Sequence, residues 1–284
     1  MMKLSMCFPE GRRKALTLSY DDGVEQDIRL LEILDRYGIK STFNLNSRYY
    51  EKDELTYEPG RIHRPMGKNL AVETFSKALK NGHEVAVHGY THPFWEQLPS
   101  DVMTYDILRD RERIEELFGT IIRGAAYPYG THSDETAEVL AKCGIRYCRT
   151  VVSTGKFNLP ENWLKMPATC HHNDGRLMDL AAKFVNETPG RGREPWLFYL
   201  WGHSYEFEDR NNWDVIERFC ETVGGKDDIW YAPNIAIYDY IAAYKSLQYS
   251  LRADLCYNPT AIPVWVQREG TPVCILPGQT LSLK

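Results

Sequence analysis

The chain has 284 residues, of which 43% are hydrophobic and 26% are charged, an ordinary composition for a folded globular protein. A net charge of −5 and a pI near 5.9, without a block of Lys and Arg, argue against a nucleic-acid partner. No apolar run is long enough for a signal peptide or a bilayer span, so we expect no membrane partner and a cytoplasmic location. Seven cysteines without CxxC spacing indicate reduced, mostly buried thiols.

Short β-type runs alternate with helical patterns along most of the chain. A strand at 14–20 precedes a helix that ends at Gly38, and a long helix opened by Ser100 and Asp101 ends at Gly119. Ser133 has the position of an N-cap for the helix after it. The expected strands number seven and cover 14–20, 39–46, 83–89, 121–128, 145–151, 196–201 and 228–231, with an irregular stretch at 151–173.

Repeated strand-then-helix order predicts an α/β fold with a parallel sheet, either curled into a barrel or extended as a doubly wound sheet. From about residue 250 the sequence changes to short β runs separated by Pro and Gly. We therefore predict a main domain over residues 1–248 and a small β-rich C-terminal extension over 249–284.

Four polar clusters follow predicted strands directly. They are Asp21 with Asp22, the sequence HGYTH at 88–92, YPYG at 127–130 and WGH at 201–203. Loops at the carboxyl ends of parallel strands form one edge of the sheet, where α/β enzymes assemble their sites. We expect the four clusters to meet there.

His88 and His92 have a spacing that lets two imidazoles reach one ion, although Gly89 and Pro93 favour a loop over a helix. Alone, this pair is more often an ordinary hydrogen-bonding or surface pair. Together with Asp22 it would make a two-histidine, one-carboxylate set, a common ligand group for a catalytic metal. Asp21 would then remain off the metal as a base. The alternative, which we favour less, is that Asp22 is an ordinary turn residue and Asp21 an ordinary surface residue.

The order YDDG, HxxxH, YPYG and LxxH resembles the signature of the polysaccharide deacetylase family, carbohydrate esterase family four, also called the NodB-homology domain. The resemblance spans residues 15 to 245 and implies a distorted (β/α)7 barrel with the β extension outside it. It also implies one divalent ion, zinc before nickel or cobalt, bound by Asp22, His88 and His92.

The resemblance further implies the catalytic roles. Asp21 matches the general base, His203 the general acid, and Tyr129 the residue whose backbone N–H helps to hold the oxyanion. In this chemistry the metal lowers the pKa of the water that serves as nucleophile, and the base removes the proton of that water. No separate cofactor-binding residue is implied.

Two positions depart from the family pattern. Ala126 stands where the family usually has an Arg that steadies the base, and Arg123 is expected to point to the opposite face of its strand. The Asp and Trp that support the acid are not evident, and Asp174 and Trp163 are the candidates. TCHHND at 169–174 suggests a helix cap as readily as a functional role, and Trp201 is the aromatic residue best placed to line a sugar site.

The sequence thus predicts a metal-dependent hydrolase that acts on amide rather than peptide bonds and removes acetyl groups, N-acetyl more readily than O-acetyl, from a carbohydrate. The alternatives are a small-amide or cyclic-imide hydrolase of the same fold, and a catalytically degenerate sugar-binding protein suggested by the two departures. The expected partner is an acetylated saccharide or a small amide; the sequence leaves the oligomeric state open.

Overall fold

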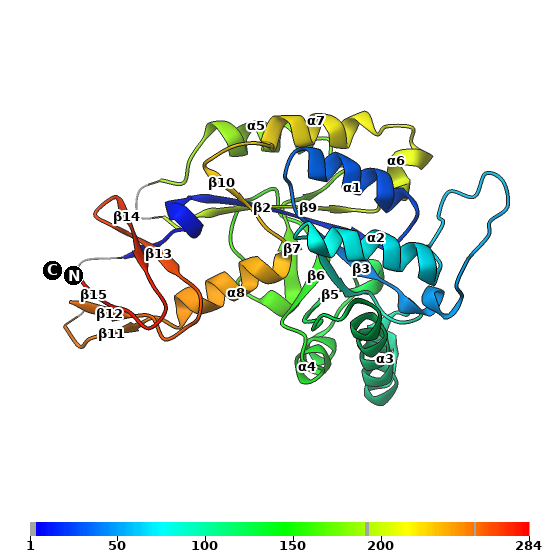
Figure 1. Ribbon diagram of the computed structural model, residues 1–284, viewed down its shortest axis with the longest axis horizontal. Coiled ribbons are helices and arrows are strands. Elements are labelled where there is room, and N and C mark those ends of the chain that lie inside the picture. The colour runs from blue at the N-terminus through cyan, green and yellow to red at the C-terminus, as the bar shows by residue number, and fades with distance from the viewer. Residues whose placement is uncertain (1–3, 191–192, 253, 284) are drawn as a thin grey trace.

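The computed structural model describes residues 4–190, 193–252 and 254–283. Its central element is a parallel sheet flanked by helices (Figure 1). The strands of this sheet are β2 (Lys14–Asp21), β3 (Ser41–Leu45), β4 (Glu84–Val87), β5 (Gly124–Ala126), β6 (Tyr147–Ser153), β7 (Met166–Ala168), β8 (Cys170–His171), β9 (Trp196–Gly202) and β10 (Ile229–Tyr231). The helices are α1 (Gln26–Arg36), α2 (Lys68–Lys80), α3 (Ser100–Phe118), α4 (Asp134–Lys142), α5 (Leu177–Asn186), α6 (Tyr205–Asp209), α7 (Asp214–Val223) and α8 (Asn234–Lys245).

The sheet closes on itself through one extended segment. Its strand order is β7-β6-β5-β4-β3-β2-β9-β8, and the two end strands, β7 and β8, are consecutive pieces of residues 166–171. Thr169 joins them: its carbonyl accepts from Gly155 after β6, and its N–H donates to Tyr199 of β9. Since this segment pairs with both neighbours, the described strands form a distorted seven-stranded barrel, as predicted.

The strand prediction was right at seven places and incomplete at one. The segment that closes the barrel, 166–171, lies in the stretch expected to be irregular. The predicted strand at 228–231 is present as β10, but it pairs only with the first residues of β2. The seventh strand of the barrel is therefore the segment 166–171, whereas the sequence suggested 228–231.

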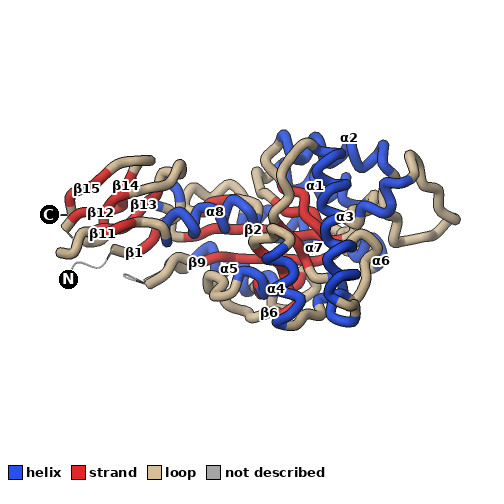
Figure 2. Tube along the Cα trace, turned by 90° about the horizontal axis from the view of Figure 1, so that it is seen from below, coloured by secondary structure: helices blue, strands red, loops and turns tan. Residues whose placement is uncertain are grey.

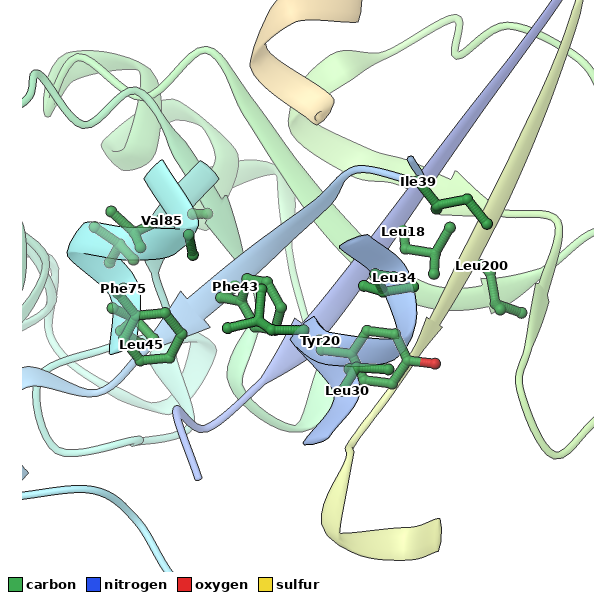
Figure 3. Close-up of a cluster of buried hydrophobic side chains, with 14 of the residues drawn as sticks. Leu18, Tyr20, Leu30, Leu34, Ile39, Phe43, Leu45, Phe75, Val85 and Leu200 are labelled. Carbon is green, nitrogen blue, oxygen red and sulfur yellow. The ribbon is translucent and has the colours of Figure 1, made fainter. Parts of the chain in front are cut away.

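The alternating residues of β2 separate the barrel interior from the helix layer. Leu16, Leu18 and Tyr20 face outward into the main apolar cluster, while Ala15 packs in a second cluster with interior residues of other strands. Figure 3 shows the outward layer, in which Leu18 and Tyr20 lie beside side chains of α1, while Phe75 of α2 lies beside Leu45 of β3. This layer fixes β2, at whose end the two aspartates lie.

Local signals set the helix boundaries. α3 begins at Ser100 and ends before Gly119, which adopts the left-handed conformation (φ 62°) that closes a helix. Ser133 accepts a hydrogen bond from the N–H of Thr136 in a reciprocal capping arrangement. Both boundaries confirm the sequence prediction. None of the helices in the described part of the chain is long and apolar enough to span a bilayer.

The last residues form two small antiparallel sheets at one end of the molecule, where both termini also lie (Figures 1 and 2). One contains β11 (Gln248–Tyr249), β12 (Leu255–Tyr257) and β15 (Thr280–Ser282). The other joins β13 (Val264–Arg268) and β14 (Thr271–Ile275) to β1 (Ser5–Met6). The extension thus includes residues from the N-terminus; the boundary at 248 stays a prediction.

Candidate active site

The two aspartates lie where β2 ends. Asp21 is the last residue of the strand, and Asp22 has a φ of +79°, a left-handed conformation that is rare outside glycine. The N–H of Asp22 donates to the carbonyl of Asn44 in the adjacent strand, which holds the turn against β3. The strained turn separates the two carboxylates, so that each has its own set of partners.

Asp22, His88 and His92 converge as the sequence predicted. One donor atom from each lies within 4.8 Å of the others, and the Asp22 Oδ1 atom is 3.7 Å from the Nε2 atoms of both histidines. His88 Nδ1 lies 2.9 Å from the Ala126 carbonyl, which only accepts, so this nitrogen carries the proton and Nε2 offers its lone pair. His92 adopts a φ of +56° in a loop rather than a helix. This donor set suits a divalent metal ion.

Asp21 makes a buried ion pair with Arg149 of β6. The Arg149 guanidinium donates to Asp21 Oδ2, and the Asn44 side-chain amide donates to Oδ1 at 2.8 Å. Burial acts to raise the pKa of Asp21, but the charges of Arg149, His88 and His203 outweigh it and hold the pKa below its usual value. Asp21 is therefore ionised and fixed, as a base must be.

His203 lies between two carboxylates. Its Nε2 atom is 3.7 Å from Asp21 Oδ2, and its Nδ1 atom is 3.8 Å from Glu206 Oε1. Burial would lower the pKa of His203, but Glu206, Asp21 and Asp22 together raise it to about 9. The imidazole is thus protonated at neutral pH and lies beside Asp21.

Two further histidines surround Glu206. His171 Nε2 and His172 Nε2 lie 3.2 and 2.9 Å from Glu206 Oε2. The Asn173 N–H donates to His171 Nδ1, so the neutral His171 ring carries its proton on Nε2, facing the carboxylate. Although His171, His203 and Glu206 also cluster within 4.8 Å, this proton placement favours a hydrogen-bonding group over a second metal site.

Tyr129 and Trp201 border the same region. Tyr129 has a φ of +58°, and its ring packs against His92 at 4.4 Å and stacks on Phe94 at 3.8 Å. Trp201 is 8% exposed, and the Arg149 guanidinium lies 4.3 Å from the centre of its ring. The site residues predicted from the sequence are therefore gathered at one end of the barrel: Asp21, Asp22, His88, His92, Tyr129 and His203.

The comparisons with known proteins agree with this geometry. Residues 9–148 match the family profile described as "Polysaccharide deacetylase". Residues 9–148 therefore resemble the polysaccharide deacetylase family, as the sequence motifs indicated. The match ends before β9, so Asp21, Asp22, His88, His92 and Tyr129 lie inside it and His203 lies beyond it.

One curated relative is the peptidoglycan deacetylase of Helicobacter pylori, which is 28% identical over 123 residues. That alignment covers 42% of this chain and only 34% of the relative. Two solved structures share the fold. The structure described as a "putative polysaccharide deacetylase" from Mycobacterium smegmatis has a TM-score of 0.57 at 18% identity, covering 86% of this chain and 96% of that one. The Puue allantoinase has a TM-score of 0.57 at 14% identity, covering 82% and 91%.

The structure also shows which residues are present where the sequence departs from the family pattern. Arg123 does not approach Asp21: it forms a two-pronged ion pair with Asp239 of α8 at 2.7 Å, as its predicted orientation implied. Arg149, one strand further along, supplies the guanidinium that Ala126 lacks.

The two candidates for support of His203 were wrong. Asp174 binds Arg176 at 2.7 Å, because its place in the turn before α5 turns it toward that side chain. Trp163 packs edge-on against Tyr238 of α8 at 5.2 Å. Glu206, three residues after His203, provides the carboxylate instead.

Sequence reasoning missed three polar residues of the candidate site. Arg149 had a signal, because it is a charge inside a buried strand. Glu206 had a weaker one, its i+3 spacing from His203. His63 had none: it lies in the long loop before α2, yet its Nε2 atom is 3.1 Å from Asp22 Oδ2.

Proposed function

We propose that the chain is a metal-dependent hydrolase that removes acetyl groups, N-acetyl in preference to O-acetyl, from a carbohydrate. The observation that carries this proposal is the convergence of a metal-type donor set, an ionised buried base and a protonated histidine at one end of the barrel. The match of residues 9–148 to the polysaccharide deacetylase profile supports it.

Asp22, His88 and His92 would hold the ion. The fit rests on the chemistry of the donors: the His88 Nε2 lone pair is available, and the three donor atoms lie too far apart to hydrogen-bond with one another. Zinc is the first candidate, with nickel or cobalt as alternatives. When bound, such an ion lowers the pKa of water and polarises an acetyl carbonyl.

Asp21 and His203 divide the proton transfers. Asp21, kept ionised by Arg149, accepts a proton from the attacking water at its Oδ atoms. His203, which is protonated at neutral pH, gives a proton to the departing amine and so prevents the poor leaving group from being expelled as an anion. The Tyr129 backbone N–H is proposed to hold the oxygen that becomes negative during the attack.

The structure weakens the case for a degenerate sugar-binding protein. That alternative rested on the missing Arg at Ala126 and on the unassigned support for His203. Arg149 contacts Asp21, and Glu206 lies beside His203, so a charged partner is present at both places. A small amide or cyclic imide remains the alternative substrate class.

Metal content together with acetate release tests the proposal. The purified protein is analysed for metal and, after reconstitution with zinc, nickel or cobalt, is assayed on N-acetylated oligosaccharides, O-acetylated sugars and small amides. We expect one ion per chain, abolished in a His88→Ala, His92→Ala double variant, and release of acetate from the N-acetylated substrates. Turnover of small amides or cyclic imides alone would replace the carbohydrate assignment. A protein that binds no divalent ion would overturn the metal-dependent mechanism.

A further inference from the structure

His63 is the hydrogen-bonding partner of the Asp22 carboxylate. The Nε2 atom of His63 lies 3.1 Å from Asp22 Oδ2, and within the described residues no other hydrogen bond to that carboxylate is found. A carboxylate oxygen only accepts, so Asp22 Oδ2 is the acceptor and His63 Nε2 the donor.

The two oxygens of Asp22 have different partners. Oδ1 is the atom that lies 3.7 Å from both His88 Nε2 and His92 Nε2, whereas Oδ2 faces His63. The bond from His63 therefore fixes the rotation of the carboxylate, with Oδ1 turned toward the two histidines. His63 is not a member of the three-residue donor group.

The loop holds His63 firmly, because its end is fastened to the turn after Asp22. Pro65 forms a β-bridge with Val24, and the Met66 N–H donates to the Gly23 carbonyl at 2.9 Å. Arg64, the residue next to His63, binds Glu25 and also Glu208 of α6.

The ring of His63 has a further packing contact. It meets the Tyr205 ring edge-on at 4.9 Å, so that its orientation is restricted on a second side. A side chain that is 29% exposed and lies outside helices and strands is thereby brought to one place and one direction.

We propose that His63 is a positioning residue for the metal-binding carboxylate: its Nε2–H holds Asp22 Oδ2 so that Oδ1 is directed to the ion. The inference rests on the proposed metal site. An unheld Asp22 would pay side-chain entropy when it binds the ion, and hydrogen-bonding partners of metal ligands commonly change metal affinity by about 10- to 100-fold.

The test is zinc affinity measured by competition with a chromophoric chelator, without any assay of turnover. His63→Ala is expected to weaken zinc binding by about 10- to 100-fold while one ion per chain still binds at saturation. His63→Gln, whose side-chain amide can place an N–H near the lost Nε2–H, should recover much of the affinity. His132→Ala is the matched control, since His132 lies in the loop after Tyr129 and hydrogen-bonds the Gly130 carbonyl. It should bind zinc as the wild type does.

The cobalt-substituted proteins give a second readout. Because His63 does not ligate, the visible spectrum of His63→Ala with cobalt should keep the shape of the wild-type spectrum. Equal zinc affinity in His63→Ala and wild type would overturn the inference and leave the metal site intact. A changed cobalt spectrum would make His63 a ligand and overturn the positioning role. Failure of the wild type itself to bind zinc or cobalt would count against the proposed function instead.

Discussion

At the scale of single residues, the adjacent aspartates contact different partners because the backbone turns between them. Asp21 ends a strand and is paired with Arg149 inside the barrel, while Asp22, at a φ of +79°, turns to the histidines. Two like charges at neighbouring positions are tolerable because each has its own positive or polar partners. The sequence showed the pair, but only the fold shows the separate partners.

Asp21→Asn tests the duty assigned to the first aspartate. The amide keeps the size of the side chain but cannot accept the proton of water, so kcat should fall by on the order of 100-fold or more. Zinc content should remain one ion per chain, because the donor group does not include Asp21. Turnover near that of the wild type would remove Asp21 from the mechanism.

Arg149→Met tests what keeps Asp21 ionised. Without the guanidinium, burial dominates and the pKa of Asp21 rises. Because the base acts only when ionised, the acid limb of the kcat/KM profile should shift to higher pH, and Arg149→Lys should shift it less.

The stability of the same variants reports on the buried pair. Breaking a buried ion pair costs about 3–5 kcal/mol of unfolding free energy, which urea denaturation measures. The exposed Arg146→Gln in the same region is the control. An unchanged acid limb in Arg149→Met would show that Arg149 has a structural role alone.

At the scale of elements, helix α3 organises the loop that carries His88 and His92. Asp106 accepts hydrogen bonds from the N–H groups of Tyr90 and Thr91 and from the Trp95 indole, at 3.0–3.3 Å. One turn later, Asp110 accepts from the N–H of His88 and from Ser47. Two carboxylates one helical turn apart thus accept the backbone hydrogen bonds that a helix or strand would otherwise satisfy in the loop.

Asp106→Ala should therefore loosen the loop from its helix. The substitution leaves several N–H donors without their acceptor, at a cost of about 1–3 kcal/mol in unfolding free energy. Urea denaturation of the metal-free protein measures this, and zinc affinity should fall as well. Glu112→Ala, at an exposed position in the middle of the same helix, should leave both quantities unchanged. Equal effects of the two substitutions would contradict the assigned role of Asp106.

Elements with strong local patterns were predictable, and the element that closes the barrel was not. α3 has an apolar period, an N-terminal Ser and a following Gly, all of which act within one stretch of chain. Residues 166–171 have no such pattern: Pro167 interrupts the run, and β7 and β8 are stabilised by β6 and β9, which are distant in sequence. The partners of Asp21 and His203 were missed for the same reason, since Arg149 and Glu206 gain their roles only through folding.

At the scale of the whole molecule, buried carboxyls at the two ends of the barrel respond to pH in opposite directions. Glu84, in the first position of β4, accepts from Thr42, Tyr147 and the Ile235 N–H at 2.7–3.0 Å, and burial raises its pKa to about 7. The unfolded chain has this pKa near 4.3, so the folded state holds an extra proton between about pH 4.3 and 7. Stability from this group is complete below that window and is lost as the pH rises through it.

Glu84→Gln should remove this part of the pH dependence. The unfolding free energy of the wild type should decline by up to about 1.4 kcal/mol per pH unit for one such proton, and the variant should decline less steeply between about pH 5 and 7. Urea denaturation across that range, on metal-free protein, measures the two slopes. Parallel slopes would show that Glu84 is not the group responsible.

Removal of residues 249–284 tests whether the barrel folds without its extension. Several contacts join the barrel and the N-terminal residues to the extension. Met6 pairs with Val266, and the Tyr240 hydroxyl accepts from the Trp265 N–H and donates to the Cys7 carbonyl. In space these contacts lie near the start of β2, whereas the candidate site lies at its other end (Figure 1). Loss of the extension should therefore lower Tm but leave zinc affinity unchanged. Trp265→Ala in the full chain, which weakens only this contact region, should lower Tm by a smaller amount. A single cooperative transition in the shortened chain would support an independent barrel, and loss of that transition would make the extension part of one folding unit.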